Sequence, residues 1–259
     1  MGIASVIQTL PLSGATIERG ALSRGTMMGG AAGAAPAKPP AISDDLKAAV
    51  DAGSLLSFVD GLTAEERDDV LYSVQLAHRN ATHEFDRFAQ TQAWYQRYIE
   101  VLQLLGWVAE NLAFTKYDQS EGELRMDKAA LALITAIATQ NQLAVLKEAV
   151  NALEKLAEGD DTIRLFDFHT STDIGGNFQI GAVQKADQGA ISMALGSFYF
   201  RSHDARRKFL FFGWGKNEVN FWTAAQKMTL NTTLYAKGRD AVKQKLEKTF
   251  PSFIAELKI

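Results

Sequence analysis

The chain has 259 residues, of which 47% are hydrophobic and 22% charged, and a net charge of −3 at pH 7. This length allows one large domain or two small ones, each with its own core. A slightly acidic chain lacks the basic excess that phosphate binding requires, so the composition argues against nucleic acid as a partner. Cysteine is absent, which excludes disulfides, thiolate nucleophiles and cysteine-based metal sites.

The sequence gives no signal for a membrane-spanning helix or for secretion. No run of the sequence reaches the roughly 18 to 20 apolar residues of a membrane-spanning helix. The start, Met1-Gly2-Ile3-Ala4, lacks the basic residues that open a secretory signal. We therefore expect a protein that is cytoplasmic when made, with release or export without a cleavable signal peptide left open.

Residues 1–41 are predicted to be a flexible arm rich in glycine, alanine and proline. The segment Gly29–Pro36 is low in complexity and cannot bury enough surface to offset the entropy lost on ordering. Near the start, Ile3, Val6, Ile7 and Leu10 are spaced to form one short amphipathic turn. Two interpretations stay open: a frayed terminus, or an assembly arm that orders against a neighbouring subunit.

Residues 42–159 are predicted to form an elongated helical hairpin or bundle. A short helix is expected within 41–61, before Gly61. The stretch from Thr63 to Phe114 opens with a capping box, in which Thr63 and Glu66 satisfy each other's free N–H groups. It is predicted to be one long helix or two nearly collinear ones. Its second half carries an apolar stripe at helical spacing: Trp94, Tyr98, Val101, Leu102, Leu105, Val108 and Leu112.

A second long helix is predicted from about Leu124 to Glu158, which would complete an antiparallel hairpin. Residues 129–146 contain no charged side chain. The simpler interpretation is a buried central helix. The alternative is a segment that leaves the core and enters a bilayer, but Gln140, Asn141 and Gln142 interrupt the apolar run.

Residues 160–259 are predicted to form an antiparallel β domain with a C-terminal helix. The hydrophobic period changes from 3.6 to 2 at Asp160-Asp161. Short strands joined by tight turns indicate an antiparallel meander or sandwich. The expected strands are 163–168, 178–185, 191–200, 209–214, 219–225 and 227–235, and the expected helix covers about 238–248.

The predicted fold class is thus α+β, with an N-terminal helical hairpin or bundle followed by an antiparallel sandwich or meander and a C-terminal helix. In outline this arrangement is similar to helical pore-forming toxins that carry a β-rich appendage. No motif carries the similarity, so it implies a shape and nothing about individual residues.

Candidate catalytic and metal-binding residues are few. His78 and His83 lie five residues apart on a predicted helix, so they do not share a face as a metal-binding pair would. His169 with Ser171 and Asp173 would suit a nucleophile and its base, but no oxyanion loop accompanies them. Gly175-Gly176-Asn177 lacks the spacing of a phosphate-binding loop. We predict no catalytic residues, no metal site and no cofactor.

The most distinctive local pattern joins aromatic strands through a basic turn, from Phe198 to Phe209. Aromatic rings beside basic side chains suit the boundary of a lipid bilayer or another anionic surface. The alternative is a solvated hairpin tip whose aromatic residues fill the core. The candidate membrane- or anion-binding residues are Phe198, Tyr199, Arg201, Arg206, Arg207, Lys208 and Trp214.

Three functions follow from these patterns. The first is a non-enzymatic bacterial protein that acts by assembly, toxin-like or effector-like, at membranes in a pore-forming manner. The second is a structural or scaffold subunit of a homo-oligomer held by its N-terminal arm. The third is a hydrolase that uses His169. The expected partners are other copies of the chain and a membrane lipid or anionic surface.

Overall fold

The computed structural model describes residues 2–14, 45–118, 123–172, 174–186, 189–202, 208–215, 218–247, 249 and 252–259. The helices are α1 (Ile3–Thr9), α2 (Ala64–Glu84), α3 (Thr91–Leu104), α4 (Met126–Thr135), α5 (Gln140–Lys155), α6 (Asp161–Thr170), the short 3-10 helix η2 (Phe209–Phe211), α7 (Thr232–Ala236) and α8 (Arg239–Leu246). The strands are β1 (Ala48–Asp51), β2 (Ser54–Phe58), β3 (Trp107–Val108), β4 (Thr115–Lys116), β5 (Leu124–Arg125), β6 (Ser171–Thr172), β7 (Gly175–Lys185), β8 (Ile191–Ser202), β9 (Gly213–Trp214), β10 (Val219–Leu230) and β11 (Ile254–Glu256).

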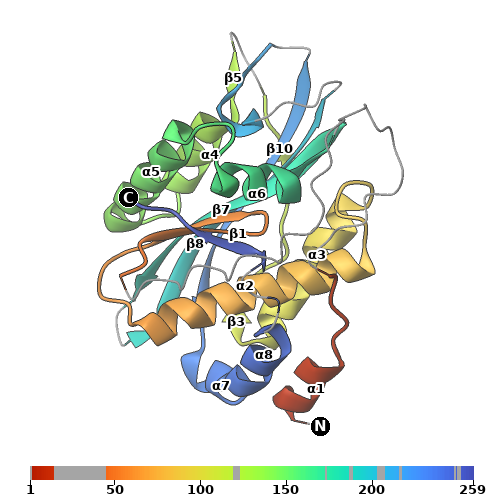
Figure 1. Cartoon of the computed structure of the whole chain (residues 1–259), viewed down its shortest axis with the longest axis vertical. Helices are drawn as coiled ribbons and strands as arrows, with labels where there is room; N and C mark the ends of the chain where they lie inside the picture. Colours follow the sequence, from red (N-terminus) through yellow and green to blue (C-terminus); the bar gives the residue numbers. More distant parts are fainter. Residues whose placement is uncertain are drawn as a thin grey trace, which may run out of the picture.

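One mixed sheet forms the centre of the described part of the chain (Figure 1). Nine strands belong to it, in the order β11-β1-β2-β7-β8-β10-β3, with β4 beside β10 and β6 beside β7. The long strands β7, β8 and β10 pair as an antiparallel meander. Strand β2 runs parallel to β7, and the hairpin of β1 and β2 thereby extends the sheet.

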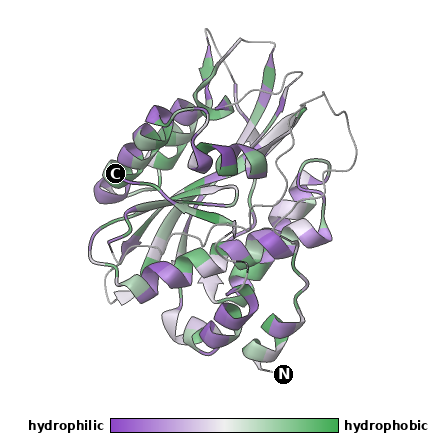
Figure 2. Cartoon of the chain, in the orientation of Figure 1, coloured by the Kyte–Doolittle hydropathy of each residue, from purple (hydrophilic) through white to green (hydrophobic). Residues whose placement is uncertain are grey.

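Helices cover both faces of this sheet, and each face has its own hydrophobic core. One core joins the sheet to α1, α2, α3, α7 and α8. The other joins it to α4, α5, α6 and η2. The helices carry hydrophilic residues on one side and hydrophobic residues on the other (Figure 2), as expected where one face of a helix is buried.

The predicted α+β class is confirmed, but the predicted sandwich and N-terminal hairpin are not. Strands from residues 42–159 and from residues 160–259 belong to the same sheet. The proposed domain boundaries stay a prediction. Most of the predicted flexible arm, residues 15–41, lies outside the described residues.

The helix predicted within 41–61 is wrong, because this segment forms the hairpin of β1 and β2. Ala52 and Gly53 make its tight turn, and Ala52 adopts a positive φ of 49°. Val50, Leu55, Leu56 and Phe58 are buried, as predicted, but in strands. A short apolar run does not distinguish a buried strand from a helix by periodicity.

The long helix predicted from Thr63 to Phe114 begins as expected and then breaks. The capping box is present, with Thr63 as N-cap and Glu66 reaching back to its backbone N–H. The chain leaves the helix at Phe85, because the Asp86 carboxylate accepts hydrogen bonds from the backbone N–H groups of Phe88 and Ala89. The returning helix α3 packs along α2 (Figure 1).

The second predicted helix is also two helices. Helix α4 ends at Thr135, and Thr139 caps α5 in a capping box with Gln142. The uncharged residues 129–146 therefore span a helix end, a turn and a new helix start. Gln142 is fully buried and donates to the carbonyl of Ala182 in β7.

In the C-terminal part, β7, β8 and the helix α8 match the prediction, whereas three other segments do not. Residues 163–168 are helical, because Asp160 caps α6 through the backbone N–H of Thr162. Residues 209–214 form η2 and β9 instead of one strand. The strand predicted for 227–235 continues β10 as far as Leu230, after which Asn231 caps α7.

Candidate functional site

A row of polar side chains crosses the sheet beneath α2 and α3. Asp51 of β1 pairs in register with Ser54 of β2, Ser54 with Gln179 of β7, and Gln179 with Ser197 of β8. All four residues are fully buried. With the polar and aromatic side chains that meet them, they form what we call the polar layer: Asp51, Ser54, Gln75, His78, Arg87, Tyr95, Tyr98, Asn177, Gln179 and Ser197.

Asp51 lies at the centre of the contact between β1 and α2. Gln75 of α2 donates a hydrogen bond of 3.1 Å to its Oδ1 atom. Burial raises the pKa of Asp51 to about 8, against the smaller opposing effects of the Gln75 hydrogen bond and the charge of Arg79. The Asp51 carboxyl is therefore protonated in the folded protein at neutral pH.

Arg87, in the turn after α2, is the second feature of the polar layer. Its side chain is 2% exposed. Its Nε atom donates to the side-chain oxygen of Asn177 over 2.7 Å, and its Nη atoms donate to the backbone carbonyls of Asn177 and His169. The guanidinium group also contacts Nε2 of His78 and lies over the Trp94 ring, 4.6 Å from the ring centroid. Four segments of the chain thus meet at one cation.

The electrostatics of this cluster follow from burial. Burial lowers the pKa of Arg87 to about 9, partly offset by Tyr95 and Tyr98. Burial, followed by the charge of Arg87, holds the pKa of His78 well below its usual range. His78 is therefore neutral and accepts through Nε2 from the arginine, which always donates. Burial raises the pKa values of Tyr95 and Tyr98, so both phenols stay neutral.

Helix α3 covers the polar layer with aromatic rings. Its inward face carries Trp94, Tyr95 and Tyr98, all at most 1% exposed. Trp94 stacks on Tyr98, and the Tyr95 hydroxyl lies 2.8 Å from the backbone carbonyl of Phe198 in β8. The first half of α3 therefore presents large amphipathic rings to the polar layer, whereas Ile99, Val101 and Leu102 of its second half pack in the apolar core.

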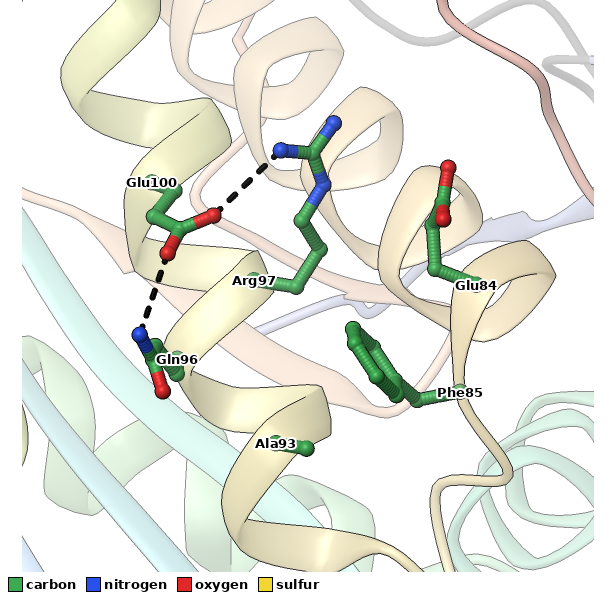
Figure 3. Close-up of a pocket in the computed structure, with 6 residues that line it drawn as sticks. All are labelled: Glu84, Phe85, Ala93, Gln96, Arg97 and Glu100. Atoms are coloured by element: carbon green, nitrogen blue, oxygen red, sulfur yellow. Dashed lines mark hydrogen bonds and ion pairs between the residues drawn. The ribbon is translucent and has the colours of Figure 1, made fainter.

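The outward face of α3 is polar and lines a shallow pocket of about 330 Å³ against the end of α2. In Figure 3, Arg97 lies between the carboxylates of Glu84 and Glu100, above the ring of Phe85. Arg97 pairs with Glu100 at 3.3 Å and also donates to Asn80 of α2. The pocket is open to solvent, and its charged groups belong to the helix surface.

The aromatic members of the predicted membrane- or anion-binding set lie mostly in the core. Phe198 and Trp214 are 0% and 1% exposed, and both belong to the core beneath α4, α5 and α6. Tyr199 points to the other face of the sheet, where it stacks on Trp222 with centroids 4.6 Å apart. Neighbouring residues of a strand point to opposite faces, so these rings do not form one patch.

The basic members of that set are held by backbone groups where they are described. Arg201 donates to the carbonyl of Phe88 and to the Thr91 hydroxyl. Lys208 donates to the carbonyl of Leu156 over 2.9 Å. Arg206 and Arg207 lie outside the described residues. A role of the set in membrane or anion binding stays a prediction.

The histidine candidates are placed as follows. His169, at the end of α6, is 1% exposed and stacks on Phe253, while the Ser171 hydroxyl donates to the carbonyl of Asp167. Asp173 lies outside the described residues. His78 is buried and His83 is exposed. In the described part of the chain, no three His, Cys, Asp or Glu side chains gather as a metal site would require.

Sequence reasoning missed Asp51, Gln75, Arg87, Asn177 and Gln179. The available signal was a polar residue in an otherwise apolar strand, as at Gln179 in Phe178–Val183. Asp51 gave no such signal, because its segment was interpreted as a helix. Arg87 gave no signal, because it lies within the stretch predicted to be helical, whereas the chain turns at Asp86.

Comparisons with known proteins give structural similarities alone. No family model and no curated protein sequence matches the chain. A delta-endotoxin structure is 9% identical with a TM-score of 0.39, covering 81% of this chain and 91% of that one. The Evf virulence factor is 9% identical with a TM-score of 0.34, covering 83% and 84%. The activated Cyt2Ba monomer from Bacillus thuringiensis subsp. israelensis is 7% identical with a TM-score of 0.37, covering 69% and 96%.

These scores describe a likeness in outline and carry no functional argument. Among the described residues, every helix is too short or too polar to pass through a bilayer.

Proposed function

We propose that this chain is a non-enzymatic protein that acts by assembly at membranes, as a toxin-like or effector-like bacterial factor. In this proposal the hairpin of α2 and α3 separates from the sheet and binds the lipid surface. The observation that carries it is the polar layer between this hairpin and the sheet.

The polar layer lowers the free energy needed to separate the two layers. Burial of apolar surface stabilises a contact by roughly 25 cal/mol per Å². Buried polar groups contribute less, because they regain hydrogen bonds to water when they are exposed. Within the described structure, Asp51 Oδ2, Gln179 Nε2 and Ser197 Oγ are buried without a hydrogen-bond partner. These atoms gain partners on separation.

The opposite face of the sheet is held differently. The core beneath α4, α5 and α6 is lined by Phe166, Phe178, Phe198, Phe209 and Leu153, with stacked phenylalanine rings. Separation there would expose apolar surface with little polar compensation. The layer beneath α2 and α3 also buries apolar side chains, among them Leu71, Val74 and Leu102, but the polar layer interrupts this apolar contact. That interruption favours the hairpin of α2 and α3 as the layer that separates.

Once released, α3 has the pattern of an interfacial helix. Its buried face carries Trp94, Tyr95 and Tyr98, residue types that favour the boundary between lipid headgroups and hydrocarbon. Its other face carries the exposed Gln96 and Glu100. A helix with one aromatic face and one polar face lies in the plane of the membrane surface.

Cysteine cross-links test this proposal, because the chain contains no cysteine of its own. Asp51→Cys with Gln75→Cys, bridged by a short bis-thiol reagent that a reductant cleaves, would join β1 to α2, because the natural side chains meet end to end and the shorter cysteines leave room for the reagent. We expect this cross-link to abolish vesicle binding in flotation assays and leakage of vesicle contents, and its cleavage to restore both. Neutral and anionic vesicles are compared, and thiol titration confirms that the cross-link has formed.

The matched control joins β7 to β8 through Ala182→Cys with Ala194→Cys, which are register partners on the opposite face. This disulfide should leave binding and leakage intact. Failure of the unmodified protein to bind either vesicle would refute the membrane role. Equal activity with the cross-link between β1 and α2 closed would refute separation of the hairpin.

A second candidate function is a scaffold subunit, favoured by the ordered docking of residues 2–14. Helix α1 packs on α8, and Ile7 is fully buried. Sizing of the intact chain and of a chain without residues 1–40 distinguishes the two functions. An oligomer that depends on the arm and ignores lipid would support the scaffold.

A further inference from the structure

Residues 2–14 occupy a surface formed by α2 and α8. Helix α1 lies beside α8 at the end of the molecule away from α4 and α5 (Figure 1). Ile7 is fully buried against α8, so closely that a Cβ atom on Gly238 would lie 2.7 Å from its Cδ1 atom. Leu10 is 8% exposed. The surface of α2 and α8 therefore fits the shape of α1 closely.

Hydrogen bonds fix the register of this segment on α8. Gln8 donates through its amide nitrogen to the carbonyl of Ala241 over 3.2 Å, and Lys245 donates to the carbonyl of Gln8 over 2.7 Å. The lysine thereby contacts one of the last carbonyls of α1, where positive charge is favourable.

Two further contacts fix the segment on α2. Asn80 donates to the carbonyl of Pro11 over 2.8 Å. The backbone N–H of Ser13 donates to the carbonyl of Arg79, and the Arg79 side chain returns two hydrogen bonds, of 3.0 and 2.8 Å, to the carbonyl of Ser13. The surface therefore recognises backbone groups as well as the apolar side chains.

The sequence between this segment and the sheet is long. Residues 15–44, thirty in number, separate Gly14 from Asp45. Thirty residues reach at most about 100 Å when fully extended. A neighbouring copy can therefore offer residues 2–14 to the same surface with the same contacts.

We infer that this surface of α2 and α8 is a docking surface for residues 2–14 of a second copy, so that copies are joined by exchange of their N-terminal segments. The inference rests on the proposed function, because assembly brings the copies together. Exchange preserves every contact. The local concentration of the two competing N-terminal segments alone therefore decides between docking within one chain and docking on a second copy. A tethered segment acts at an effective concentration in the millimolar range, and neighbouring copies in an assembly reach comparable values.

A mixing experiment separates exchange from docking within one chain. One population carries Gln8→Cys and the other Lys245→Cys. They are mixed, assembled at high concentration and on vesicles, and treated with a short bismaleimide. A cross-link between these two positions requires the segment of one chain to lie on α8 of another. We expect a covalent species of two 28.3 kDa chains on a denaturing gel.

The matched control replaces the second population by one with Glu148→Cys, an exposed position on α5 in the other helix layer. It should give no more cross-linking than the background of random collisions. A chain with both Gln8→Cys and Lys245→Cys shows that the reagent spans the docked pair.

Three results decide the inference. Selective cross-linking between populations supports exchange. Assembly in which only the double variant cross-links, within single chains, overturns exchange and leaves the proposed function intact. Absence of any assembly, measured by sizing and flotation, overturns both.

Discussion

Replacement of Asp51 by asparagine tests the electrostatics of the polar layer. Asp51 is fully buried and its pKa is raised to about 8, whereas an aspartate in an unfolded chain has a pKa of about 3.9. Between these two values the folded protein holds a proton that the unfolded chain has released. The free energy of unfolding must therefore fall as the pH rises through this window.

The magnitude follows from the shift. Each pKa unit corresponds to about 1.4 kcal/mol. Between about pH 5 and about pH 7, Asp51 alone lowers the free energy of unfolding by about 3 kcal/mol, and the loss ends near the folded pKa of about 8. His78 acts in the opposite direction, because its lowered pKa makes the folded state lose stability as the pH falls below about 6.5. The natural chain and the Asp51→Asn variant share this contribution of His78, so it cancels when their free energies of unfolding are compared.

Asp51→Asn keeps the shape of the side chain and removes its titration. We expect urea unfolding curves, followed by tryptophan fluorescence at a series of pH values, to show a variant that gains about 3 kcal/mol on the natural chain between about pH 5 and about pH 7. Asp60→Asn is the matched control, because the Asp60 side chain is 88% exposed. If the free energies of unfolding of the natural chain and of Asp51→Asn differ by a constant amount from about pH 5 to about pH 7, a protonated Asp51 is refuted.

Other substitutions test the remaining contacts. Arg87→Met should lower the free energy of unfolding by about 3 to 5 kcal/mol, because four buried acceptors lose their donor; a loss within about 0.5 kcal/mol in urea unfolding would contradict this. Gly53→Ala should destabilise by about 1 to 3 kcal/mol, since its Cβ would lie 2.7 Å from a guanidinium held by several hydrogen bonds. Gly159→Ala, with no atom within 4 Å, should change stability by less than about 0.5 kcal/mol. Asp69→Ala removes the two hydrogen bonds, of 2.8 and 2.6 Å, that Arg239 makes from α8; we expect faster amide exchange in α8 before the rest of the chain, and unchanged exchange would show that the apolar packing of α8 holds it without these bonds.

Local signals in the sequence predicted elements whose stability depends on near neighbours. Thr63 and Glu66 cap α2 as expected, since a capping box involves residues three apart. The alternating strands β7 and β8 were predicted for the same reason, as was the first part of the apolar stripe, from Trp94 to Leu102, which is buried in α3. The rest of the predicted stripe is wrong, because α3 ends at Leu104 and Val108 lies in β3, 71% exposed. The break at Asp86 was missed, because an aspartate on a helix surface and one that begins a turn look alike without their surroundings.

The candidate site shows the limit of this reasoning. His78 was noted, but as a poor metal ligand. Its actual neighbours, Arg87 and Asn177, come from a turn and a distant strand. The aromatic and basic residues around Phe198 were predicted to bind a membrane or an anionic surface. Those that the structure describes lie largely in the core or donate to backbone carbonyls.

The sequence by itself determined the α+β class, the start of α2, the strands β7 and β8, and the amphipathic pattern of α3. These depend on hydrophobic period and on hydrogen bonds between residues a few positions apart. Only the tertiary structure decided that β1 and β2 lie in the same sheet, with β2 parallel to β7, and that Asp51, Ser54, Gln179 and Ser197 form one buried row. Register between strands more than a hundred residues apart is set by packing against the helices, and no local pattern encodes it.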